Sequence, residues 1–263
     1  MIKRELKANL KSFIIWTSIL IGLFVVVLIT YPLVFTDENM GVLDEMMAMM
    51  PEELLKAFNM DISSISTEYG WLKSEGILMI IMIVGIFGGI LGSTICLKEE
   101  NDNTIEYLAM LPITRRKIII DKVIVSIIYI TLMVVISGLF NLVGLLISGE
   151  FNISEYLMIA VSPLFVALPL FSINLLISMF LKNTKKSLLL AIGITFVSYF
   201  FLIMGEIDDA TTFFKYFSVF SFADTRNIIL EGSMNILLIL GSLILSSVLI
   251  VLSILKYEKK ELI

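Results

Sequence analysis

Six long apolar runs divide the chain, and they limit what it can fold into more than any other feature. They cover residues 13–35, 76–97, 123–147, 156–181, 187–205 and 235–255. A helix needs about 20 apolar residues to cross the hydrocarbon core of a bilayer. Hydrophobic residues make up 58% of the chain, whereas about 45–50% is usual for a soluble domain. We therefore expect an all-α polytopic membrane protein, with residues 1–263 as one membrane domain of six transmembrane helices.

The basic residues lie in alternate polar segments. With the N-terminus inside, the inner segments are 1–12, 98–122, 182–186 and 256–263. They carry 15 of the 19 Lys and Arg residues, while the outer segments carry only Lys56, Lys73, Lys215 and Arg226. The positive-inside rule then predicts that both termini are cytoplasmic. Because the chain is rich in Ile, Lys and Asn, as low-GC bacteria are, we expect a bacterial cell membrane.

The first apolar run follows a basic stretch and could be mistaken for a signal peptide. It spans residues 13–35, longer than the about 7–15 residues of a signal core, and no small-residue cleavage site follows it. We therefore interpret it as a retained membrane anchor.

The composition offers little for catalysis. The chain has no histidine, which is the commonest general base and metal ligand, and Cys96 is its one cysteine. We expect no catalytic residue, no bound metal and no cofactor. No basic residue falls inside a predicted span, which argues against an ion-coupled transporter or a voltage sensor.

The first outer segment, 36–75, has an amphipathic pattern. Its apolar residues follow helical spacing at Leu43, Met46, Met47, Met50, Leu54 and Phe58. Pro51, followed by two acids, resembles the start of a second helix. We predict two short helices that either cap the bundle or form a flexible methionine-rich gate or substrate surface.

The second outer segment, 206–234, crowds aromatic residues among charges. They are Phe213, Phe214, Tyr216, Phe217, Phe220 and Phe222. Aromatic side chains gather at membrane interfaces. A re-entrant hairpin before the last span and an interfacial helix both fit this pattern.

Two spans carry residues that affect helix packing. Gly85, Gly88, Gly89 and Gly92 form two overlapping pairs with small-xxx-small spacing, which permits close approach of another helix. Pro163 and Pro169 fall inside the fourth span, where each leaves a backbone carbonyl without its usual donor.

The most polar stretch of the chain's first half, residues 98–117, lies between two of these apolar runs. Asn103 and Glu106 have capping-box spacing, and Pro112 ends the predicted helix, which runs from Thr104 to about Leu111. Its apolar face comprises Ile105, Leu108 and Ala109. A helix this short is not stable alone, so its exposed apolar face requires a partner.

This stretch resembles the signature of ABC-2 type ABC transporter permeases. The matching residues are Glu99, Glu100, Asn103, Thr104, Glu106, Leu108, Pro112, Arg115 and Lys122. The sequence departs from the family at Asn103, where Gly is usual, and at Asp121, where Gly often precedes the Lys. Six spans, a basic N-terminal segment and a hairpin before the last span are also family features.

The resemblance implies a coupling helix that docks into a separate ATP-binding subunit. The implied coupling residues are Glu99, Glu100, Asn103, Thr104, Ile105, Glu106, Leu108, Pro112 and Arg115. It also implies that residues 1–12 form a connecting helix along the inner membrane surface, and that a second permease chain, identical or different, completes the transporter. The chain has no P-loop, so ATP and Mg²⁺ belong to the partner subunit.

The favoured function is therefore the permease subunit of an ATP-driven exporter for an amphipathic or hydrophobic cargo, such as a peptide, toxin, antibiotic or lipid. Its partners are the ATP-binding subunit, the second permease chain and the bilayer, with no nucleic acid. The alternatives are a non-transporting membrane subunit, such as a sensor or immunity factor on the same fold, and a membrane enzyme.

Overall fold

A computed structural model gives the structure of the chain. It describes residues 1–34, 36, 41, 45–46, 48–51, 68–101, 113–148 and 151–260. The long helices are α1 (Ile2–Val34), α6 (Ile77–Thr94), α9 (Arg115–Ser148), α10 (Ile153–Ser178), α11 (Thr184–Ile207) and α13 (Ile236–Glu258). The shorter elements are α5 (Glu68–Trp71), the π-helical η1 (Leu72–Gly76), α7 (Lys98–Asn101), the 3-10 helices η2 (Asp209–Phe217) and η3 (Val219–Ala223), and α12 (Thr225–Glu231).

The predicted fold class is confirmed. Within the described ranges, six helices are long and apolar enough to cross a membrane, and no strand occurs. Each predicted apolar run overlaps one of them. Asparagine side chains cap the starts of three: Asn152 for α10, Asn183 for α11 and Asn235 for α13 accept hydrogen bonds from backbone amides in the first turn.

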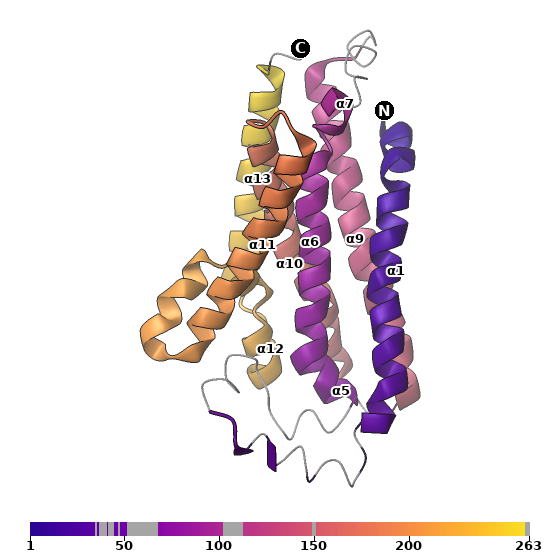
Figure 1. Cartoon of the computed structure of the whole chain (residues 1–263), viewed down its shortest axis with the longest axis vertical. Helices are drawn as coiled ribbons and strands as arrows, with labels where there is room; N and C mark the ends of the chain where they lie inside the picture. Colours follow the sequence, from indigo (N-terminus) through magenta and orange to yellow (C-terminus); the bar gives the residue numbers. More distant parts are fainter. Residues whose placement is uncertain are drawn as a thin grey trace.

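The helices α6 and α10 form the centre of the bundle. Their apolar windows are 61% and 67% buried, against 22% for α1 and 17% for α13. Figure 1 shows α6 in the middle, with α1 and α9 to one side and α11 to the other. The outer helices therefore turn wide apolar faces outward, as expected for a protein surrounded by lipid.

Glycines allow α6 to approach α10 closely. A Cβ atom at Gly88 would lie 2.7 Å from the Ala167 carbonyl oxygen, and one at Gly92 would lie 2.9 Å from the Leu175 nitrogen. The other two glycines of the motif also face neighbouring helices of the same chain: Gly85 lies against Leu170, and Gly89 against Asn174 and Thr195. The small-residue pairs therefore pack inside one chain.

Two prolines lie inside the continuous helix α10, and serine hydroxyls compensate for them. A proline cannot donate to the carbonyl four residues earlier. The freed carbonyls and their substitute donors are Ile159 O with Ser162 Oγ at 3.0 Å, and Phe165 O with Ser242 Oγ at 2.7 Å. Because Ser242 belongs to α13, this replacement also joins α13 to α10.

The start of the chain differs from the expectation. The resemblance predicts a separate connecting helix over residues 1–12, but α1 runs unbroken from Ile2 to Val34. No Gly or Pro occurs before position 22, and Lys, Leu and Ala favour helix, so nothing ends the helix early. The Tyr129 hydroxyl on α9 donates to the Leu6 carbonyl at 2.5 Å, which holds these first turns against α9.

The chain reverses after α11, and η2 packs back along that helix (Figure 1). Gly205 provides the space, since a Cβ there would lie 3.0 Å from the Lys215 nitrogen. The Ser218 hydroxyl donates to Ser198 O, and the Val219 amide donates to Ser198 Oγ, both at 2.7 Å. Ser198 lies nine residues before the end of α11, about 14 Å along the axis. The segment after α11 therefore folds back against that helix as a hairpin, and the re-entrant and interfacial placements both remain predictions.

Two predicted segments fall largely outside the described residues. Most of the amphipathic segment 36–75 does, so its two short helices remain a prediction. Its described end forms α5 and η1, which continue directly into α6. The helix predicted from Thr104 to about Leu111 also lies outside the described residues.

Candidate functional site

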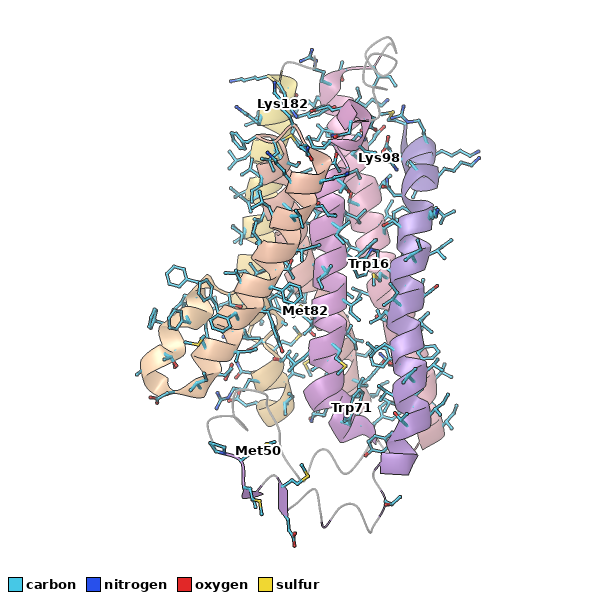
Figure 2. The ribbon with its side chains drawn as sticks, viewed as in Figure 1. Trp16, Met50, Trp71, Met82, Lys98 and Lys182 are labelled. Atoms are coloured by element: carbon cyan, nitrogen blue, oxygen red, sulfur yellow. The ribbon has the colours of Figure 1, made fainter. Side chains whose placement is uncertain are left out.

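One end of the bundle brings together the residues that flank the predicted coupling helix. We call it the basic end; it comprises the start of α1, α7, the start of α9, the turn between α10 and α11, and the end of α13. Figure 1 shows both termini and α7 at this end, and Figure 2 labels Lys98 and Lys182 there. The charge asymmetry predicts that this end faces the cytoplasm.

Three of the predicted coupling residues lie in the described part of the chain. Glu99 and Glu100 are on α7, and Arg115 is the first residue of α9. The others lie outside it: Asn103, Thr104, Ile105, Glu106, Leu108 and Pro112. The described residues thus reveal how the segment 102–112 is held at its two edges.

Lys122 is a deeply buried charge at the basic end, with 1% of its side chain exposed. Its ammonium group donates to Glu5 Oε2 at 3.2 Å, to Glu99 Oε1 at 2.5 Å and to the Ile95 carbonyl at 2.7 Å. Three acceptors match its three protons. The Ile95 carbonyl lies at the end of α6, where positive charge is favourable. One side chain on α9 therefore joins α1, α6 and α7.

Arg4 balances the charge of this group. Its guanidinium lies 2.8 Å from Glu5 Oε1 and 3.4 Å from Glu99 Oε1, so two cations face two carboxylates. Replacing a buried ion pair with apolar groups is often harmless, but removing one member leaves an uncompensated charge. We therefore interpret the group as fixing how α1, α7 and α9 meet, more than as a source of stability.

The helix α7 is tied to the remaining segments of the basic end as well. Four residues cannot form a stable helix alone, so these contacts hold it in place. They are Lys98 Nζ to Ala8 O at 3.2 Å, Asn101 Nδ2 to Lys182 O at 3.5 Å, Thr184 Oγ1 to Leu97 O at 3.5 Å, and Lys260 Nζ to Glu100 Oε1 at 2.7 Å.

Lys260 contacts residues on both sides of the segment 102–112. Its ammonium group lies 2.7 Å from Glu100 Oε1, before the segment, and its backbone carbonyl accepts from Arg115 Nη1 at 2.6 Å, after the segment. Both edges are therefore held beside the end of α13. A force on the segment 102–112 would reach α13 through Lys260. It would reach α1 and α9 through Glu99.

Glu5 is not among the residues predicted from the sequence, and Lys122 is among them only by resemblance. The sequence nevertheless contains a feature that marks each of these two residues. Glu5 is the one acidic residue in the basic segment 1–12, and Lys122 is followed by a long apolar run. Their pairing depends on the rotation of α1 relative to α9, which neither local pattern specifies.

The opposite end of the bundle has its own polar contacts. Glu155, in the first turn of α10, accepts from the Tyr69 hydroxyl and from Lys73 Nζ, each at 2.9 Å. Burial, followed by the hydrogen bond to this carboxylate, raises the pKa of the Tyr69 phenol above its usual value. These contacts join α5 and η1 to α10.

Glu206, at the end of α11, is held between two cations of the hairpin region. Lys215 Nζ lies 2.8 Å from its Oε1, and Arg226 Nη1 lies 2.5 Å from its Oε2. A cavity of about 330 Å³ lies beside this group, and its lining combines these charges with aromatic residues such as Tyr216 and Phe222.

Comparison with known families decides the identity. A family model described as ABC-2 family transporter protein matches residues 1–262. The chain belongs to the ABC-2 transporter family. No curated protein and no solved structure matches its sequence.

Membership in the ABC-2 family confirms the resemblance inferred from residues 99–122. The protein is a membrane-spanning permease subunit of an ABC transporter. ABC-2 permeases are not themselves the ATPase and work with an ATP-binding subunit. The six apolar helices agree with an integral membrane protein of this family.

Proposed function

We propose that this ABC-2 permease is the transmembrane part of an exporter that moves an amphipathic or hydrophobic cargo outward across the bacterial cell membrane. ATP is hydrolysed, with Mg²⁺, on the separate ATP-binding subunit. A second permease chain, identical or different, completes the pathway. Both termini and the whole basic end face the cytoplasm, in line with the asymmetry of Lys and Arg.

One observation carries this proposal: Lys260 and Lys122 tie both edges of the segment 102–112 to the rest of the bundle. Glu100 and Arg115 meet Lys260, and Glu99 meets Lys122. A docking segment anchored in this way transmits a displacement to α1, α9 and α13 together. The coupling residues of the permease are accordingly those of positions 99–115 named from the sequence.

The nature of the cargo is inferred from the outer half of the protein. The cavity beside the hairpin combines charged side chains with aromatic ones, and the outward faces of α11 and α13 are broadly apolar. Such surfaces suit a cargo that has both polar and apolar parts. A peptide, toxin, antibiotic or lipid meets this description.

Co-purification tests the coupling role. Tagged permease, solubilised in detergent from membranes of its native host, should bring down a P-loop ATPase. The variant Leu108→Asp should lose that subunit, because docking would bury a carboxylate on the apolar face of the predicted helix, and removing a carboxylate from water is unfavourable. Met110→Asp is the matched control, since helical spacing puts Met110 on the opposite side of the segment.

The outcomes separate the alternatives. Normal co-purification of Leu108→Asp, or no ATPase with the unmodified chain, contradicts the coupling role. Export is tested with inside-out vesicles, where ATP added outside should drive accumulation of an amphipathic fluorescent dye. A complex that hydrolyses ATP but moves no dye, native peptide or lipid would identify the non-transporting subunit instead.

A further inference from the structure

Two buried polar atoms at the basic end have no hydrogen-bond partner within the part of the chain that the structure describes. They are Glu99 Oε2 on α7 and the Tyr257 hydroxyl in the last turn of α13. Tyr257 is fully buried. Leaving such groups unpaired costs free energy, so a structural reason for retaining them is needed.

The two atoms are complementary, and they belong to neighbouring parts of the fold. A phenol donates, and an ionised carboxylate oxygen accepts. Tyr257 belongs to the same packed core as Ile95 and Cys96, which lie directly before α7. The 2.7 Å contact between Lys260 and Glu100 already holds the end of α13 beside α7.

Glu99 can leave Lys122 without leaving the ammonium group of that lysine without acceptors. If α7 carried Glu99 away, Lys122 would keep Glu5 at 3.2 Å and the Ile95 carbonyl at 2.7 Å. Arg4 would likewise keep Glu5. The second carboxylate beside Lys122 is therefore the movable one.

The chain also provides a joint at which α7 can move. A turn over residues 95–97 separates α6 from α7. The helix α7 leads directly into the segment 102–112, so movement of that segment would rotate α7 about this turn. Discrete changes of this kind require an element with two stable packings.

We propose that Tyr257 is a positioning residue of the coupling mechanism. When the ATP-binding subunit shifts the segment 102–112, Glu99 turns from Lys122 toward α13 and its Oε2 accepts the Tyr257 hydroxyl. The new hydrogen bond draws α7 to α13 and stabilises the nucleotide-bound arrangement. This inference rests on the proposed coupling function.

The test measures the distance between α7 and α13 in the assembled transporter. Spin labels are attached at Lys98→Cys and Lys259→Cys, both exposed positions, with the buried Cys96 replaced by alanine. Electron–electron resonance distances are compared between the nucleotide-free complex and the complex trapped with ATP and vanadate. We expect the distance to shorten on trapping, and Tyr257→Phe to reduce the shift by at least half.

Tyr129→Phe is the matched control. It removes a hydroxyl from the same region, but one that already bonds to Leu6 O. It should lower the thermal midpoint of the nucleotide-free complex and retain the distance shift. Tyr257→Phe should leave that midpoint unchanged or raise it, because its hydroxyl has no partner to lose.

Each other outcome overturns the proposal. It is wrong if trapping does not shorten the label-to-label distance in the parent, or if that distance shortens as much in Tyr257→Phe as in the parent. It is also wrong if Tyr257→Phe lowers the thermal midpoint of the nucleotide-free complex. Failure of the ATP-binding subunit to co-purify with the unmodified chain is a different result, because it removes the proposed coupling function itself.

Discussion

Each end of the bundle holds a buried charge between two charges of the opposite sign. The two buried charges differ in sign, and their contacts differ in how far apart the partners lie in the sequence. At the basic end, Lys122 lies between Glu5 and Glu99. At the hairpin, Glu206 lies between Lys215 and Arg226. The contacts of Lys122 reach across 117 and 23 positions of the chain, whereas Arg226 is 20 positions from Glu206.

This difference in reach separates two roles. The group around Lys122 joins α1, α7 and α9, so it sets the relation between helices that are distant in sequence. The group around Glu206 closes one local hairpin against the end of α11. A disturbance at the basic end should therefore affect the whole bundle, and one at the hairpin should remain local.

The largest effect is expected from Lys122→Met. It leaves Glu5 and Glu99 buried without their shared cation, which costs about 3–5 kcal/mol for a broken buried pair. We expect low yield and a strongly reduced thermal midpoint in detergent. Lys117→Met, an exposed position on the same helix, should behave like the parent. Equal stability of the two variants would show that the buried group does not hold the helices together.

The second prediction concerns the hairpin. Gly205→Leu places a side chain where the backbone of Lys215 now lies, 3.0 Å from a Cβ at that position. Overpacking of this kind costs about 1–3 kcal/mol. Limited proteolysis should cut within 206–223 while the helices remain intact. Gly193→Leu, where a Cβ meets nothing within 4 Å, is the control and should resist cutting; general unfolding of the Gly205 variant would contradict the local role.

A smaller effect is expected from Glu206→Gln. It removes the negative charge shared by two cations, but Arg226 is 45% exposed and can turn to water. Solvent screening limits the loss to about 1 kcal/mol. Glu231→Gln, an exposed acid after the same hairpin, is the control. A loss as large as that of Lys122→Met would remove the distinction between the two ends.

The sequence predicted the parts of this structure that depend on local composition. The six helices follow from apolar runs, because each span needs lipid-compatible residues along its own length. The asparagines at 152, 183 and 235 also precede apolar runs, so their capping role could have been predicted from the sequence, although it was not among the predictions above. The absence of Gly and Pro before position 22 also favours an unbroken α1, but the family resemblance favoured a separate connecting helix.

The polar contacts of the basic end could not be predicted in this way. Whether Glu5 meets Lys122 depends on how α1 is rotated and shifted against α9, across 117 positions. The contacts of Lys260 with Glu100 and Arg115 depend on where α13 ends. No local pattern contains either quantity, since both arise from packing between helices.

The smallest effect should come from Arg116→Met, six residues before Lys122 on the same helix. Arg116 lies 3.6 Å from Glu258, but 71% of its side chain is exposed. Exposed pairs contribute about 0.2–1 kcal/mol, so the thermal midpoint should fall only slightly, and high salt should remove the difference. Because both residues pair with carboxylates at the basic end, the contrast with Lys122→Met isolates burial as the cause. A large, salt-independent loss in the Arg116 variant would mean that charge at this end matters wherever it lies.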